Sequence, residues 1–404
     1  MKQREVVITH AVRTAIGTRG GTLKQVPPNE LAACVFRAII DRSGIDPNLV
    51  DNVLMGQTKP STRPMNVARY AWLEAGLPDS VPATTTYRAC CSGVQPMFDA
   101  AQMISCGDLD IVVAGGVDSL NESVYSLRGA RYGVGNKNAV FMDALTENST
   151  CNVPKVVYGN FSLGNVAEHI AEKWNVTREE QDQLAVQSHA RALEAIEKGY
   201  FKEQIVPFNG FDTDEHPKHT SMEKLSKLKP SFKPDGTVTA GNASGQNDAA
   251  ACVLMMTREK AEELGLKPEL RFVSAAAVSL DPHILLMGPM KAVPEALERA
   301  GLKMSDIGLV EMNEAFASST IASMRELVKL DEKETYEALN ARTNVCGSGI
   351  SLGHPPGATG CMMLTRLLYD MKRLNVRYGM VTMCVGGGHG FASIWERVDG
   401  GEDK

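Results

Sequence analysis

The sequence predicts a layered α/β protein built from two similar halves, and three observations lead to this prediction. Apolar segments of strand length alternate along the 404 residues with segments of helical periodicity, which is typical of α/β folds. Two groups of segments in the first half recur in the same order in the second half. The stretch between the halves, residues 121–245, is rich in Asn, Lys, Glu and Pro and has a different texture.

The predicted strands are β-branched or largely apolar, as strands covered on both faces are. They span residues 6–12, 110–114, 252–257, 270–278, 379–384 and 390–395. The predicted helices span residues 30–42, 66–75, 94–105, 294–300, 315–328 and 358–371. This alternation of strands and helices indicates sheets covered by helical layers.

The internal repeat has two parts. Segment 43–57 aligns with segment 300–314, since each reads as a helix end at glycine, a polar turn and a short apolar strand. Residues 90–101 followed by 110–116 parallel residues 353–364 followed by 379–387. Each of these places a reactive side chain at a helix start and ends in an apolar strand with glycines. A duplicated α/β unit is the simplest explanation.

The segment between the halves is expected to be an insertion with its own helices. Its longest predicted helix covers about residues 178–198, and Thr177 with Glu180 forms a capping box at the start. We interpret the insertion as a lid over a site built by the two halves. The expected domains are residues 1–120 with 246–269, residues 121–245, and residues 270–404.

Composition excludes several classes of protein. The net charge is −6 and no block of basic residues occurs, so nucleic-acid binding is not expected. No apolar run has the ~18 residues that a membrane span needs, and the first residues lack an apolar signal core, so we expect a cytoplasmic protein.

The cysteines are better explained as free thiols than as a disulfide framework. There are nine of them, an odd number, at positions 34, 90, 91, 106, 151, 252, 346, 361 and 384. The last three, with His354 and His389, do not have the paired short spacings of a structural zinc site, so no metal is expected.

The stretch RACCSGV raises the question of a nucleophile at Cys90. If a helix begins at Ser92, its N–H groups and dipole favour a thiolate and lower the thiol pKa. Gly93 allows a ligand to approach closely. The alternative is a buried, inert cysteine. Cys91, which must point elsewhere, is interpreted as structural.

Two later glycine-rich stretches supply possible partners. His354 lies between Gly353 and two prolines, ahead of a helix expected near residue 358, and the repeat places it where Cys90 stands in the first half. A thiol and an imidazole brought together are a nucleophile and its base. Cys384 ends a strand that runs into Gly386, whose N–H can bind a developing oxyanion. The alternative at Cys384 is a tight hairpin with a core cysteine.

Asn313 is a further candidate, between a predicted strand and a predicted helix. It is placed to cap the helix, but its carboxamide can instead hold a water molecule or a carbonyl oxygen.

Taken together, these stretches resemble the thiolase family, the acetyl-CoA acetyltransferases and 3-oxoacyl-CoA thiolases. The resemblance rests on ordered motifs over nearly the whole chain, at residues 11–23, 66–69, 90–93, 236–248, 313–316, 353–360 and 384–388. It implies a five-layered α-β-α-β-α fold from two duplicated halves with an inserted loop domain. It also implies CoA-dependent cleavage of a 3-oxoacyl-CoA, or the reverse Claisen condensation, through an acyl-cysteine.

The resemblance implies a role for each candidate residue. Cys90 would carry the acyl group as a thioester and His354 would take its proton. Cys384 would act as the acid and base at the acetyl carbon. Asn313, through a water, and His354 would form one oxyanion hole, and the N–H groups of Cys90 and Gly386 the other.

The coenzyme A contacts are also implied by the resemblance. Ser244 is similar to the family's pantetheine-contacting serine, and Ala315 and Phe316 to its tunnel wall. Leu163 lies in Ser-Leu-Gly, where many members have His-Met-Gly. Lys218 lies in the region that meets the nucleotide phosphates, or is a solvated surface charge. Acyl-CoA and CoA would be substrates, with no tightly bound cofactor.

The resemblance further implies a homodimer or homotetramer, with residues 127–136 where tetrameric members carry an assembly loop. Cys91 and Leu286 depart from the family pattern near the acyl pocket, and residues 137–157 do not follow it closely. Two alternative functions remain: a ketoacyl synthase-like condensing enzyme, which does not need the second thiol at Cys384, and a noncatalytic acyl-CoA-binding protein.

Overall fold

The computed structural model describes residues 4–59, 64–147 and 151–399. Its strands are β1 Val6–Thr14, β2 Gly17–Thr18, β3 Asn52–Gly56, β4 Ala83–Thr86, β5 Ile111–Ser119, β6 Tyr125–Leu127, β7 Phe141–Asp143, β8 Ile205–Val206, β9 Asn247–Thr257, β10 Leu270–Ser279, β11 Leu309–Met312, β12 Tyr378–Val385 and β13 His389–Arg397. Its α-helices are α1 Pro28–Ser43, α2 Val67–Glu74, α3 Gln95–Cys106, α4 Ala144–Glu147, α5 Lys155–Tyr158, α6 Leu163–Lys173, α7 Arg178–Glu197, α8 Met222–Ser226, α9 Arg258–Glu263, α10 Gly288–Ala300, α11 Ala317–Leu327, α12 Tyr336–Arg342 and α13 Pro356–Leu374. Every strand and helix expected from the sequence is present.

The strand order confirms the duplication. The main sheet runs β11-β12-β13-β10-β1-β9-β5-β3-β4. Reading outward from the antiparallel β1·β10 pair, the N-terminal half gives β1-β9-β5-β3 and the C-terminal half gives β10-β13-β12-β11, with equivalent connections. The two halves join where Val7 pairs with Arg271 and Ile8 with Leu270. The first part of the repeat, segments 43–57 and 300–314, is present as well. Helix α1 ends at Gly44 and helix α10 ends at Gly301, and both glycines have the left-handed conformation.

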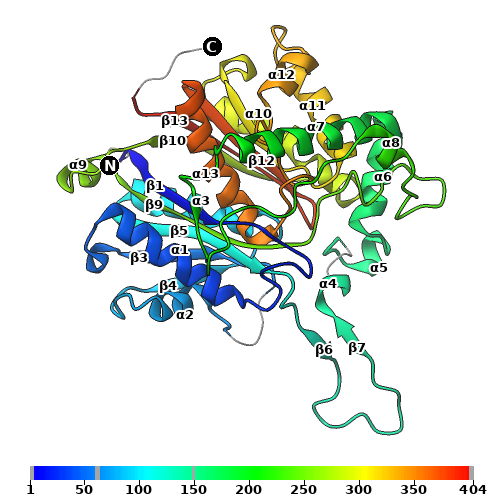
Figure 1. Ribbon diagram of the computed structural model, residues 1–404, viewed down its shortest axis with the longest axis horizontal. Coiled ribbons are helices and arrows are strands. Elements are labelled where there is room, and N and C mark those ends of the chain that lie inside the picture. The colour runs from blue at the N-terminus through cyan, green and yellow to red at the C-terminus, as the bar shows by residue number, and fades with distance from the viewer. Residues whose placement is uncertain (1–3, 60–63, 148–150, 400–404) are drawn as a thin grey trace.

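Helices and sheets alternate in five layers. One core lies between the two halves, where α3 and α13 pack (Figure 1), and further cores lie outside them, under α1 and α2 in one half and under α10 in the other. Residues of β9 alternate accordingly: Val253 and Met255 belong to the inner core, Cys252 and Leu254 to the outer one. The strands therefore read as continuous apolar runs because both of their faces are buried.

The inserted segment forms small helices against the C-terminal half. Helix α6 packs on α11, where the Ser318 hydroxyl donates to the Ala167 carbonyl at 2.9 Å. Helix α7 begins with the expected capping box, because Thr177 Oγ1 accepts from the Glu180 N–H and the Glu180 carboxylate accepts from the Thr177 N–H. The β6–β7 hairpin projects away from the body of the molecule (Figure 1).

One helix boundary differs markedly from expectation. Helix α10 begins at Gly288, six residues before the expected start at Pro294, and Pro294 lies inside the helix. Proline is favoured in the first turn of a helix, where its missing N–H leaves no helical hydrogen bond unmade. In the structure Pro289 fills that place, and the helix continues through the second proline.

Close glycine contacts hold the segments of Cys90 and His354 together. Residues Cys91–Gly93 form a short 3₁₀ turn that lies against the ends of β3 and β5 and against α13. A Cβ atom on Gly56 would lie 1.8 Å from the Ser92 carbonyl oxygen, and one on Gly116 would lie 1.8 Å from the Gly357 carbonyl oxygen. Because backbone meets backbone at these points, a side chain has no room there.

Gly116→Ala is therefore expected to lower the free energy of unfolding by about 3 kcal/mol, because the added methyl forces β5 and α13 apart. The matched control is Gly20→Ala. Gly20 has φ +73° and nothing within 4 Å, so it carries only the left-handed penalty of about 1 kcal/mol. Thermal midpoints of the two variants measure the difference. Equal midpoints would show that β5 and α13 move apart without any loss of stability.

Candidate active site

The structure brings Cys90, His354, Cys384, Asn313 and Gly386 together from both halves of the fold. Cys90 follows β4, His354 precedes α13, Cys384 lies at the end of β12 and Asn313 follows β11. The Gly386 N–H donates to the Cys90 sulfur, and the ionised Cys90 thiol is close enough to raise the pKa of Cys384. Asn313 Nδ2 lies 3.5 Å from His354 Nε2. The two turns that carry Cys90 and His354 touch each other, because a Cβ atom on Gly93 would lie 2.6 Å from the Gly357 carbonyl oxygen.

Cys90 lies on a constrained turn. Ala89 before it has φ +44°, a left-handed conformation that costs energy for a residue with a Cβ atom. The Ser92 hydroxyl stabilises this turn, since it accepts from the Arg88 N–H and donates to the Ala89 carbonyl, both at 2.8 Å. Strained backbone of this kind is typical of positions that hold a reactive side chain in place.

The expected lowering of the Cys90 pKa is wrong. No α-helix begins at Ser92: the residues form a single 3₁₀ turn, and α3 starts at Gln95. Burial raises the pKa of the Cys90 thiol, and the N–H groups of Gly386 and Cys90 itself offset only part of that rise. A short turn has no strong dipole, so Cys90 is a neutral thiol at neutral pH.

The hydrogen bonds of His354 define its tautomer. The Thr359 hydroxyl donates its only hydrogen to the Pro355 carbonyl at 2.8 Å. It must therefore accept from His354 Nδ1, which lies 2.7 Å away, and Nδ1 carries the ring hydrogen. Burial lowers the pKa of His354 to about 4, so the ring is neutral and the Nε2 lone pair faces the Asn313 Nδ2 donor at 3.5 Å.

Both thiol and imidazole are thus expected to be neutral in the resting protein, rather than an ion pair. The pKa of Cys90 is above the ordinary value of 9.0 and that of His354 is about 4, so neither group changes charge near pH 7. Titration of the ultraviolet thiolate absorbance should show no ionised Cys90 at neutral pH, by difference between the protein and its Cys90→Ala variant. A thiolate signal that persists down to pH 5 would show that the ion pair exists.

Asn313 does not cap the following helix. Helix α11 starts at Ala317, with Phe316 as its capping residue. Instead the Asn313 backbone N–H donates to Thr382 of β12 at 3.1 Å, and the side chain is 4% exposed. Its Oδ1 atom is buried without a hydrogen-bond partner among the described residues. An orphaned buried oxygen indicates a place for a water molecule or a ligand donor.

Cys384 is a buried thiol at the end of a tight hairpin. It lies one residue before the end of β12, 3% exposed, and Val385 pairs with His389 across the turn. Gly387 and Gly388 have φ +91° and +85°, which the turn requires. Burial raises the pKa of Cys384, and a charge on Cys90 raises it further. The hairpin interpretation is therefore correct, and the thiol also lies beside Cys90.

Four of the five expected coenzyme A contacts lie in one region. The Ser244 N–H donates to the Ala315 carbonyl at 3.0 Å, and Phe316 and Leu163 belong to the same apolar cluster. The ring of Phe316 meets that of Phe232 edge to face, 6.1 Å between centroids.

Lys218 has an exposed side chain. Its backbone N–H donates to His189 Nδ1 at 3.3 Å. Burial lowers the pKa values of His189 and His216 to about 4, and the charge of Lys218 contributes to the lowering. The structure therefore places it beside the two histidines.

Sequence reasoning gave no role to three residues next to this site. Asp118 is a carboxylate inside the apolar strand β5, and Asn247 is the buried first residue of β9. A charged side chain in a run of buried residues was the available signal for Asp118. Lys59 follows β3, and its positive charge lowers the pKa of Cys90. Nothing in its local sequence marked Lys59.

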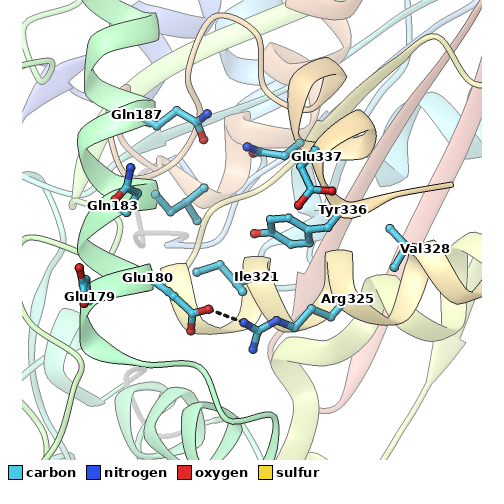
Figure 2. A pocket seen from close by; sticks show the side chains of 11 residues that line it. Glu179, Glu180, Gln183, Gln187, Ile321, Arg325, Val328, Tyr336 and Glu337 are labelled. Carbon is cyan, nitrogen blue, oxygen red and sulfur yellow. Dashed lines mark hydrogen bonds and ion pairs between the residues drawn. The ribbon is translucent and has the colours of Figure 1, made fainter.

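A separate cavity of about 670 Å³ lies between α7, α11 and α12 (Figure 2). The Glu180–Arg325 ion pair crosses it, and Tyr336 points into it. None of the expected site residues lines this cavity.

The described residues contain no group of three or more His, Cys, Asp or Glu side chains placed to hold a metal ion. None of their helices is long and apolar enough to cross a membrane.

Comparisons with known proteins agree with this architecture. Residues 6–259 match the thiolase N-terminal domain and residues 266–397 the thiolase C-terminal domain. The chain is 42% identical to the acetyl-CoA acetyltransferase of Pseudomonas aeruginosa, and the match covers 96% of this chain and 98% of that relative. It is 43% identical to the beta-ketothiolase BktB of Cupriavidus necator, and that match covers 98% of this chain and 100% of the relative. The crystal structure of the Bacillus anthracis acetyl-CoA acetyltransferase superposes with a TM-score of 0.92 at 41% identity, covering 98% of this chain and 100% of that one. The chain belongs to the thiolase family.

Proposed function

We propose that the protein is an acyl-CoA C-acetyltransferase, a thiolase that cleaves a 3-oxoacyl-CoA with free CoA or runs the reverse Claisen condensation. The observation that carries the proposal is that two thiols, Cys90 and Cys384, lie together while the turn that carries His354, a neutral imidazole, packs against the turn of Cys90. Two thiols are needed because the reaction needs both a nucleophile at one carbon and an acid at its neighbour.

In the first step His354 Nε2 takes the proton of the Cys90 thiol, and the sulfur attacks the 3-oxo carbon. The bond between carbons 2 and 3 then breaks, which leaves the acyl group on Cys90 and the enolate of acetyl-CoA. The Cys384 thiol gives its proton to carbon 2 of that enolate. The proton held by His354 then passes to the Cys384 thiolate, which restores the Cys384 thiol and the neutral imidazole. Free CoA attacks the thioester at Cys90, and its thiol proton passes to His354 and from there to the departing Cys90 sulfur, so that acyl-CoA leaves and the site returns to its starting state.

Two oxyanions form, and each has its own donors. The N–H groups of Gly386 and Cys90 point at the Cys90 sulfur, so they lie next to the carbon bonded to it. These two N–H groups are therefore the donors to the oxyanion of the tetrahedral intermediate formed at Cys90. Asn313 has an unpartnered buried oxygen, so it is suited to hold a water that, with His354, binds the enolate oxygen.

The same proposal assigns the CoA side of the site and the assembly. Ser244, Ala315, Phe316 and Leu163 contact the pantetheine, with Lys218 near the phosphates and with CoA and acyl-CoA as substrates only. Residues 121–245 form the loop domain over it, between halves at 1–120 with 246–269 and at 270–404. The protein works in the cytoplasm as a homodimer or homotetramer. Exposed apolar side chains on the β6–β7 hairpin support the assembly, Tyr132 at 97% and Phe141 at 69%.

The test is release of acetyl-CoA from a panel of 3-oxoacyl-CoA substrates of different length when CoA is added, followed by chromatography. Cys106→Ser is the control for loss of a thiol, because Cys106 is exposed at the end of α3, and it should keep full activity. Binding of acyl-CoA without turnover of any member of the panel would favour the noncatalytic alternative and overturn the proposal.

A further inference from the structure

We infer that Asp118 and Asn247 are positioning residues that hold the turn of residues 353–357 from the N-terminal half and so fix the place of the His354 imidazole. The inference rests on the proposed function for its kinetic consequence, but the contacts stand independently of it. Both side chains are fully buried, with 0% exposure.

Asn247 binds the backbone of the turn at His354. Its Oδ1 accepts from the His354 N–H at 3.0 Å, and its Nδ2 donates to the Gly17 carbonyl at 3.0 Å. Nδ2 also lies 3.3 Å from His216 Nδ1. A Cβ atom on Gly353, which has φ +99°, would come within 2.3 Å of the Asn247 carboxamide, so the side chain packs directly on the turn.

Asp118 holds the last residue of the turn. Its Oδ2 accepts from the Gly357 N–H at 2.6 Å and from the Thr58 hydroxyl. Its Oδ1 accepts from the N–H groups of Thr58 at 2.9 Å and Lys59 at 3.2 Å. Gly357 lies in the first turn of α13, whose N–H groups have no partner within the helix, so a carboxylate is well placed there.

The turn has few other ways to be held. Between residues 354 and 357 only His354 and Gly357 have a backbone N–H, because Pro355 and Pro356 have none. Asn247 and Asp118 take both. The two residues come from the same end of two adjacent strands, β5 and β9, since Asp118 pairs with Ala249, two residues beyond Asn247. The backbone of the turn is then held at two points, and the Thr359 hydroxyl holds the ring itself at Nδ1.

Loss of either contact should move the base relative to the Cys90 sulfur rather than weaken CoA binding. A misplacement of about 1 Å in a reacting group costs on the order of 10²-fold in rate. Neither side chain contacts the region of Ser244, Ala315 and Phe316 through any hydrogen bond of the described residues. The expected signature is therefore a lower kcat with an unchanged KM for CoA.

The test compares Asn247→Ala and Asp118→Asn with Asn121→Ala. Asn121 follows β5 at the same end of these strands, and its side chain bonds to Thr18, Gly20 and Asp248 but not to the turn. Each variant is assayed for kcat, KM for CoA, thermal midpoint and the rate at which iodoacetamide alkylates Cys90. We expect kcat to fall roughly 10-fold to 10²-fold in the first two variants at unchanged KM, and alkylation to fall by as much in Asn247→Ala. In Asp118→Asn the fall in alkylation should be smaller, because the Asp118 charge raises the pKa of Cys90 and its loss favours the thiolate. Both rates should stay near wild type in Asn121→Ala.

Equal kcat and equal alkylation in all three variants would overturn the inference. So would a fall in kcat that matches the fall in thermal midpoint across the three, because that would make the effect general destabilisation. If the wild type has no thiolase activity, the proposed function fails, and the alkylation rates still decide whether the two residues position His354.

Discussion

Cys90→Ser is expected to lower the rate of thiolysis by at least about 10³-fold. The base at this position can deprotonate a thiol but not an alcohol. The base beside it, His354, has a pKa of about 4, which makes it too weak to take a proton from an alcohol at a useful rate. A thiol with a raised pKa is still far more acidic than a serine hydroxyl, so only the cysteine can use this base.

Intact-mass spectrometry after incubation with acetyl-CoA measures the same change directly. The unmodified protein should gain one acetyl group and the Cys90→Ser variant none. The matched control is Cys91→Ala, because Cys91 is the adjacent thiol, is fully buried in the inner core, and has a pKa raised well above 9.0. This control should still acquire the acetyl group. An acetylated Cys90→Ser variant would place the acyl group on a different residue.

Much of the fold was accessible from the sequence because its signals are local and repeated. Strands such as β9 and β12 are buried on both faces and read as unbroken apolar runs. The repeat then predicted that the Cys90 and His354 segments would meet, and the structure has both against the ends of β3 and β5. The glycines that permit this contact, Gly56 and Gly116, could be seen in the sequence, but the backbone that each one faces could not.

The ionisation of the site could not be predicted in the same way. The direction of the Cys90 pKa depends on burial by segments far apart in the chain, and the local turn was read as the start of a longer helix. The partners of Asp118 and Asn247 lie 239 and 107 residues away. Residues 137–157 had no assigned role, yet the Cys151 carbonyl accepts from the Gly387 N–H at 2.9 Å, next to Gly386. Contacts of this kind become visible only in the folded structure.

Cys384→Ser is expected to separate the two halves of the reaction. Acylation of Cys90 by acetyl-CoA needs the nucleophile, His354 and the N–H groups of Cys90 and Gly386, all of which remain. Protonation of carbon 2 needs an acid, and a serine hydroxyl is weaker than a thiol by several pKa units. Thiolysis and condensation should therefore fall by about 10³-fold or more, while exchange of labelled CoA into acetyl-CoA continues within roughly tenfold of the wild-type rate.

The separation is informative because Cys384 and Cys90 lie so close together that a charge on one raises the pKa of the other. A thiol whose pKa is raised in this way stays protonated at neutral pH and is ready to donate, which is what the enolate needs. The control is Cys361→Ala, another buried thiol of raised pKa, on α13, which should lose neither activity. If exchange falls together with thiolysis in Cys384→Ser, then Cys384 supports the nucleophile rather than the acid step, and the division of labour between the two thiols is wrong.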